Sequence, residues 1–228
     1  THTNVAGGGG SFLPAVSADG QVVAFVSYAK NLVTNSESSP YLDVFVRDLR
    51  NGTTILVSAN TSGHGGGDDN SNDPAISADG RFIAYASEAG NLVSYDTNRA
   101  SDVFVFDRVA GATTLVSINR NGGTSWLRPS LSPVISANGR WVVFQSMAED
   151  LADDIITSER VRHLYVRDLQ AGKTYLVSAP AEFSDFNTLP GRYESYSPVI
   201  TPDGSRIVYI STLTNLVQIG RASCRERV

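Results

Sequence analysis

The stretch that decides the fold is PAISADGRFIAYAS at residues 74–87, because the chain contains four recognisable versions of it. Its central motif, SADG, stands at residues 17–20 and 77–80, and it returns as SANG at 136–139 and as TPDG at 201–204. The spacings are 60, 59 and 65 residues. DVFV at Asp43 and Asp102 and HLYV at His163 keep nearly the same period. The chain is therefore predicted to consist of tandem structural repeats.

Each repeat contains four strand-like pieces, which in the second copy are residues 73–77, 81–87, 102–107 and 113–117. Val, Ile, Phe, Tyr and Thr dominate these pieces, as strands require. The second piece is apolar at nearly every position, so both of its faces are expected to be buried. Four-stranded units that bury both faces in tandem predict an all-β fold, a β-propeller of antiparallel blades. A β-sandwich is the alternative, but it gives no reason for four similar units.

The four copies resemble the TolB-like, WD40-like (PD40) propeller repeat of bacteria, whose hallmark is a Pro-x-x-Ser-Pro-Asp-Gly hairpin followed by an apolar strand. They read PAVSADGQVVAFVS (14–27), PAISADGRFIAYAS (74–87), PVISANGRWVVFQS (133–146) and PVITPDGSRIVYIS (198–211). The resemblance covers about residues 12–217 and implies a propeller. Ser-Ala replaces the hallmark Ser-Pro in three copies, and each repeat is longer than the ~40–45 residues of a WD40 repeat. This longer variant resembles the tandem propeller segments of large exported bacterial proteins.

The repeats divide the chain into a glycine-rich connector at residues 1–11, blades at 12–60, 72–119 and 131–179, and half a blade at 196–217. Propellers close with about four to eight blades. The chain is therefore expected to be a fragment, and the remaining blades of its own propeller are missing. Residues 219–228, IGRASCRERV, look like the translation of a sequencing adapter and are expected to be a non-native tail.

Composition excludes several classes of protein and site. The 18 Lys and Arg residues against 23 Asp and Glu give a net charge of -5, which does not support a basic nucleic-acid face. The single cysteine, Cys224, excludes an internal disulfide and any CxxC site. No apolar run approaches the ~18 residues of a membrane span. The acidic balance, the two lysines and the family resemblance favour a periplasmic or extracellular location, with a signal peptide not present in this sequence.

No catalytic motif and no cofactor-binding motif is recognised. The best candidate for chemistry is the long loop of the second repeat, where Asp96, Asn98 and Asp102 offer oxygen ligands for calcium. A turn held by Asx hydrogen bonds explains the same residues without a metal. Asp48, Asp107 and Asp168 recur at the end of each third strand and are predicted to cap the turn into the fourth strand.

The connectors between blades differ most among the repeats, and variable loops on a rigid scaffold are where repeat proteins place binding. Trp126, Arg128, Arg192 and Tyr193 are the candidate partner-binding residues, although they could instead fill the rim between blades. The sequence therefore predicts a non-catalytic interaction scaffold for an unknown protein or glycan. The family resemblance leaves two alternatives: an accessory propeller of a hydrolase such as a prolyl-oligopeptidase-like peptidase, or part of a TolB-like metal-dependent polysaccharide lyase.

Overall fold

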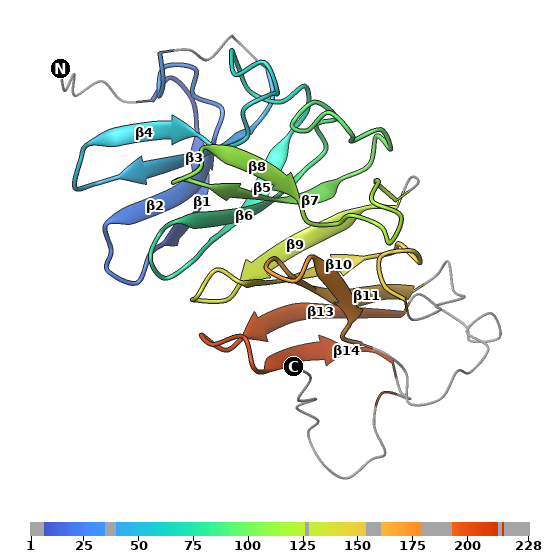
Figure 1. Ribbon diagram of the computed structural model, residues 1–228. Helices are drawn as coiled ribbons and strands as arrows, with labels where there is room; N and C mark the ends of the chain where they lie inside the picture. Colours follow the sequence, from blue (N-terminus) through green and yellow to red (C-terminus); the bar gives the residue numbers. More distant parts are fainter. Residues whose placement is uncertain are drawn as a thin grey trace.

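The computed structural model describes residues 7–34, 40–125, 128–153, 161–178, 193–213 and 216, and the statements below concern these residues. Their regular structure consists of strands alone, arranged in sheets that follow one another along an open arc (Figure 1). The predicted all-β, incomplete propeller is confirmed. The described residues include no helix with the length and apolarity that membrane crossing requires. The expected non-native tail lies outside the described residues.

Three complete blades and half of a fourth make up the arc. The strands of blade 1 are β1 (Ser11–Val16), β2 (Val22–Ser27), β3 (Asp43–Asp48) and β4 (Thr53–Leu56). Those of blade 2 are β5 (Ser71–Ile76), β6 (Phe82–Ser87), β7 (Asp102–Asp107) and β8 (Ala112–Leu115). Those of blade 3 are β9 (Ser130–Ile135), β10 (Trp141–Ser146), β11 (Val161–Asp168) and β12 (Lys173–Leu176). The half-blade contains β13 (Tyr193–Ile200) and β14 (Ile207–Ser211). Within each blade, consecutive strands pair antiparallel.

The SADG motif forms the hairpin turn between the first two strands of a blade. In blade 2, the Ser77 hydroxyl donates to Asp79 Oδ1 at 2.6 Å, and the backbone N–H of Arg81 donates to the same oxygen at 3.0 Å. Gly80 has a φ of 71°, which a glycine adopts without steric cost. The motif therefore repeats because the turn needs a hydroxyl, a side-chain acceptor and a glycine at fixed positions.

The same glycine also lets neighbouring blades approach closely. A Cβ at Gly80 would lie 2.7 Å from the Cγ2 of Val22 in blade 1, and a Cβ at Gly139 would overlap the ring of Phe82 in blade 2. At Gly20, in the turn of blade 1, a Cβ would meet nothing within 4 Å. Each hairpin turn therefore packs on the second strand of the preceding blade, and in blade 1 this position is open.

Backbone hydrogen bonds join the hairpin turns of successive blades. The N–H of Ala18 donates to the carbonyl of Ala78 at 2.9 Å, and the N–H of Ala78 donates to the carbonyl of Ala137 at 3.0 Å. The third link is longer, from the N–H of Asn138 to the carbonyl of Pro202 at 3.4 Å. The arc is thus held by a repeated main-chain link as well as by side-chain packing.

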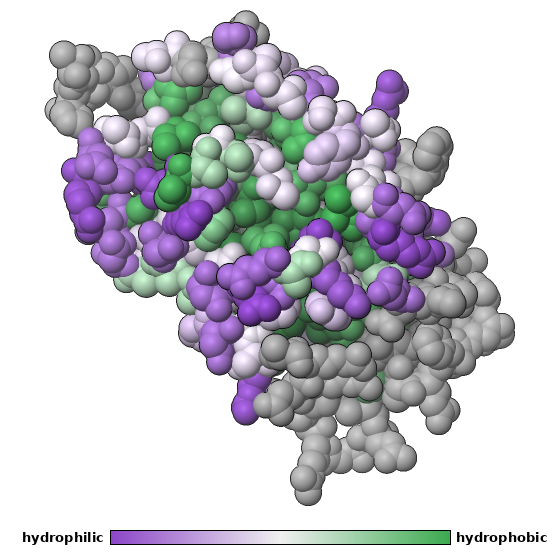
Figure 2. All heavy atoms as spheres, in the orientation of Figure 1, coloured by the Kyte–Doolittle hydropathy of each residue, from purple (hydrophilic) through white to green (hydrophobic). Residues whose placement is uncertain are grey.

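Each complete blade has a stacked aromatic pair between its second and third strands. The ring centroids are 5.9 Å apart in Phe25–Phe45, 5.7 Å in Tyr85–Phe104 and 5.9 Å in Phe144–Tyr165. β10 is buried along its whole length, as the uninterrupted apolar pattern predicts. In Figure 2, apolar residues form a band through the middle of the view, with hydrophilic residues mainly along its edges.

The two ends of the arc expose apolar side chains on strands whose counterparts in the inner blades are less exposed. Phe12 in β1 is 51% exposed, and Val208 in β14 is 56% exposed. These strands lie at opposite ends of the arc in Figure 1. Since neighbouring blades cover the corresponding strands elsewhere, each end presents an uncovered inter-blade face.

Blade 3 and the half-blade are joined by a short parallel pairing, in which Val161 pairs with Tyr193 and Arg162 with Glu194. β11 has eight residues where β3 and β7 have six, so it extends far enough to reach β13. The amide of Gln145 adds a hydrogen bond of 2.8 Å to the carbonyl of Ser195. The half-blade is therefore joined to blade 3 by main-chain pairing, by a side-chain hydrogen bond and by apolar packing.

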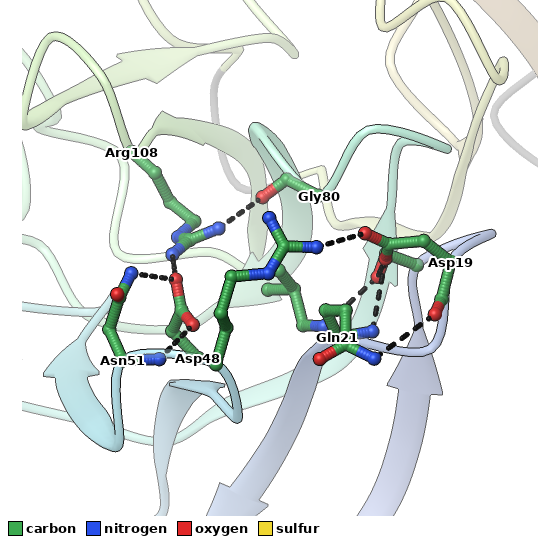
Figure 3. Close-up of polar contacts among 9 residues, drawn as sticks. Asp19, Gln21, Asp48, Asn51, Gly80 and Arg108 are labelled. Carbon is green, nitrogen blue, oxygen red and sulfur yellow. Dashed lines mark hydrogen bonds and ion pairs between the residues drawn. The ribbon is translucent and has the colours of Figure 1, made fainter.

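The predicted capping role of the three recurring aspartates is confirmed. The backbone N–H of Asn51 donates to Asp48 at 2.9 Å, as Figure 3 shows. The N–H groups of Val109 and Ala110 donate to Asp107, and those of Gln170 and Ala171 to Asp168. These aspartates are structural, because their acceptor oxygens hold the turn that leads into the fourth strand.

Candidate functional site

A β-bulge occurs at the same place in the first strand of every blade. Leu13, Asp73, Ser132 and Ser197 have φ values of 49°, 53°, 51° and 50°, which are uncommon for residues other than glycine. Each directly precedes the repeated proline, and the strand register shifts at each of these points. Because the conformation recurs four times, the repeat itself imposes it.

The four bulges line a central cavity of about 530 Å³. The backbone is the same in each, but the displayed side chain is an aliphatic group, a carboxylate or a hydroxyl. The hydroxyl of Ser132 lies 3.5 Å from Asp73 Oδ2, so the two bulges contact each other across the boundary between blades. The other lining residues include the repeated prolines with Gln145 and Tyr196.

A second cavity, of about 700 Å³, lies where the connector before β5, the β6–β7 loop and the beginning of β9 meet. We call it the acidic cavity, because its wall carries four acidic side chains and one arginine. They are Asp68, Asp69, Glu88, Asp96 and Arg99.

Hydrogen bonds hold two of the three predicted calcium ligands. The amide nitrogen of Asn98 donates to Asp102 Oδ2 at 2.8 Å and to the carbonyl of Ser125 at 2.7 Å, while its oxygen accepts from the N–H of Ala100. The Ser117 hydroxyl donates to the other oxygen of Asp102 at 2.5 Å. The third residue, Asp96, lines the acidic cavity.

A calcium ion at Asn98 would have to displace its amide nitrogen, which points at two acceptors. In the part of the chain that the structure describes, no group of three or more His, Cys, Asp or Glu side chains is arranged to hold a metal. Calcium at Asp96, Asn98 and Asp102 stays a prediction, and the Asx-type bonds of Asn98 account for the loop without it.

Burial controls the ionisation of the residues that begin the third strands. Burial raises the pKa of Asp102 to about 7 and raises that of Asp43 in the same position of blade 1. In blade 3 the position holds His163, and burial lowers its pKa to about 4. A serine two residues after the fourth strand contacts each of these groups: Ser117, Ser58 and Ser178. At this position, a buried hydrogen bond connects the third strand of each blade to the residues that follow the fourth strand.

Two of the predicted partner-binding residues, Trp126 and Arg192, lie outside the described residues. Arg128 is partly buried two residues before β9, and the backbone of Tyr193 begins β13. Their partner-binding role stays a prediction.

Sequence reasoning singled out Asp96 of the acidic cavity, but it did not find the other acids of that cavity or the bulge residues of the central cavity. The bulge residues all directly precede the repeated proline, and a residue before proline has a restricted backbone. This shared position was the sequence signal that could have indicated an unusual conformation there. The acids of the second cavity come from separate segments with no repeated spacing, so only the fold brings them together.

No family model matches the chain, and no curated protein sequence is similar to it. Among solved structures, the putative TolB from Agrobacterium tumefaciens is 16% identical over 86% of the chain, with a TM-score of 0.53. TolB from Acinetobacter baumannii is 14% identical over 88% of the chain, with a TM-score of 0.48. The chain spans 52% and 37% of those two proteins. The likeness to the Agrobacterium structure shows the fold, which is that of a β-propeller.

Proposed function

We propose that the chain is a non-catalytic interaction module whose partner, a protein or a glycan, enters the central cavity. The observation that carries the proposal is the set of four bulges, which hold one backbone conformation and display different side chains. Strained backbone of this kind is concentrated at binding and catalytic sites. A shared backbone conformation with different side chains suits recognition, because each bulge can make a separate contact with the partner.

The chemistry of the cavity supports binding without turnover. The described lining residues offer hydroxyls, one carboxylate, an amide and prolines. His163 lies elsewhere, buried within blade 3 against Ser178. We further propose that the parent protein is exported and works in the periplasm or outside the cell, as its acidic composition and TolB-like fold favour.

Asp73→Asn tests the proposal, because asparagine tolerates a positive φ and the substitution removes only the charge. The purified chain is immobilised and offered a glycan panel in one arm and an exported-protein fraction in the other. We expect one specific ligand, whose binding falls by about fivefold or more in Asp73→Asn, the loss of one charged contact. Asp153→Asn is the control, because Asp153 is exposed and pairs only with Lys173 in the described structure.

Two results would contradict the proposal. One is a ligand that binds wild-type and Asp73→Asn equally, which would place binding outside the central cavity. The other is chemical conversion of the bound ligand by the purified chain, detected by mass spectrometry, which would make the chain an enzyme.

A further inference from the structure

The acidic cavity contains a carboxylate oxygen that is buried and unpaired. Asp96 is 8% exposed, and its Oδ1 has no hydrogen-bond partner. Leaving a buried charged acceptor unpaired is costly, so such an atom calls for a ligand or another explanation. Asp102, six residues further along the chain, has both oxygens bonded by Ser117 and Asn98. The unpaired oxygen therefore belongs to the one carboxylate of this loop that lines the cavity.

The charge around Asp96 is not neutralised within the described chain. Burial raises the pKa of Asp96, the backbone N–H of Asn98 partly offsets this, and the charge of Asp68 raises the pKa further, so the two carboxyls are close enough to interact. Arg99 is the one basic residue of the wall, and no ion pair joins it to the four acids among the described residues. The cavity keeps an excess of negative charge, which attracts a cation.

The size and composition of the cavity identify the kind of cation. Its volume of about 700 Å³ far exceeds that of a metal ion and is in the usual range for molecular ligands. Its acids are spread around the wall and are not gathered as a metal site in the described structure. Pro129 and Leu131 add an apolar side to the wall, against which a methylene chain can pack.

We propose that the acidic cavity binds a guanidinium group on an aliphatic stem, the arginine side chain of a partner polypeptide. Guanidinium presents five N–H donors in a fixed plane and pairs with carboxylates through two parallel bonds. The carboxylate of Asp96 supplies the acceptor, Glu88 and Asp68 the surrounding negative charge, and Leu131 the surface for the stem. This site is separate from the central cavity, so the inference does not rest on the function proposed above.

The test is a titration of the ¹⁵N-labelled chain with the capped tripeptide N-acetyl-glycyl-arginyl-glycinamide, followed by amide chemical shifts. The same peptide with citrulline is the ligand control, because citrulline keeps the shape and lacks the charge. We expect shifts centred on Gly90 and Asp96 with the arginine peptide alone, and weaker binding as salt increases. Calcium chloride is titrated separately as a metal probe.

Three variants make the titration decisive. Asp96→Asn and Glu88→Gln are each expected to weaken binding by about fivefold, and Arg99→Asn to strengthen it, since each change alters the charge of the wall. Asn also tolerates the φ of 54° at Arg99. Asp153→Asn, an acid outside the cavity, leaves binding unchanged. One-dimensional proton spectra confirm that each variant is folded, and Glu88→Gln carries the test if Asp96→Asn does not fold.

The proposal is overturned by any of three results: no shifts with the arginine peptide, equal shifts with the citrulline peptide, or binding that Asp96→Asn and Glu88→Gln leave unchanged. Calcium that binds at the same amides and excludes the peptide would identify a metal site in its place.

Discussion

Arg108 of blade 2 bonds to Asp48 of blade 1 across the boundary between the blades, with Arg108 Nη2 and Asp48 Oδ2 3.1 Å apart (Figure 3). Arg108 Nη1 donates to the carbonyl of Gly80, in the hairpin turn of its own blade, at 3.0 Å. Asp48 also caps the turn of Asn51. One arginine thus connects the hairpin turn of one blade to the capped turn of the blade before it.

We predict that Arg108→Met lowers the thermal midpoint by about 3 °C or more, because it removes two hydrogen bonds and leaves the partly buried Asp48 without its ion-pair partner. Arg50→Met is the matched control. Arg50 pairs with Asp19 at 3.5 Å, but the two side chains are 70% and 54% exposed, and exposed pairs contribute little. Differential scanning calorimetry of both variants checks the prediction, and equal midpoints for the two would contradict it.

Gly139→Ala and Gly20→Ala separate blade packing from backbone strain. The two glycines have φ values of 70° and 71°, so alanine carries the same strain at both. At Gly139 the added Cβ overlaps Phe82, whereas at Gly20 it meets nothing within 4 Å. We expect Gly20→Ala to cost about 1 kcal/mol and Gly139→Ala at least about 2 kcal/mol more. Urea unfolding measures both, and similar losses would show that the turn does not pack as described.

The stability of the chain is expected to depend on the ionisation of Asp102. Burial raises its pKa to about 7, so the folded chain binds this proton more tightly than the unfolded chain does. The favourable contribution is complete below about pH 4 and is lost as the pH rises to about 7. Asp102→Asn should remove this dependence. Unfolding midpoints at pH 5 and pH 8 test it, and an unchanged difference between the two midpoints in the variant would count against a raised pKa.

His163 is expected to act in the opposite direction. Burial lowers its pKa to about 4, so the unfolded chain takes up this proton more readily than the folded chain. Its contribution is complete above about pH 6.5 and is lost as the pH falls towards 4. His163→Asn in the Asp102→Asn background should flatten the decline between pH 6.5 and pH 4.5, as measured by urea unfolding. A decline that persists would assign it to other groups.

The fold could be predicted from sequence because the same local signals occur four times. Ser77, Asp79 and Gly80 form one turn from three adjacent residues, so the sequence motif and the structure coincide. The uninterrupted apolar pattern of the second strands likewise predicts that both of their faces are buried. The cavities could not be predicted in this way, because Asp68 and Asp96 meet only after the connector and the loop have folded.

Calcium at Asp96, Asn98 and Asp102 stays a prediction, and residue type alone does not decide it. Asp96, Asn98 and Asp102 have the oxygen atoms of a calcium loop, but ligand chemistry depends on which atoms remain unbonded. Asn98 turns its nitrogen towards Asp102, and Asp102 bonds to Ser117 from a different strand. Orientation of this kind follows from tertiary contacts and is not encoded in the spacing of the residues.

The hydrogen bonds between hairpin turns all have the same direction along the arc, because the earlier blade donates and the later blade accepts. Each complete blade donates an N–H to the carbonyl of the turn that follows it, from Ala18 to Ala78 and onwards. Pro202 occupies the same position in the half-blade and has no N–H to donate. The half-blade can therefore donate such a link only from Asp203, the counterpart of the Asn138 that donates in blade 3. A link beyond the half-blade is expected to follow the longer geometry of the Asn138–Pro202 contact, at 3.4 Å, and not the shorter geometry of the Ala18–Ala78 contact, at 2.9 Å.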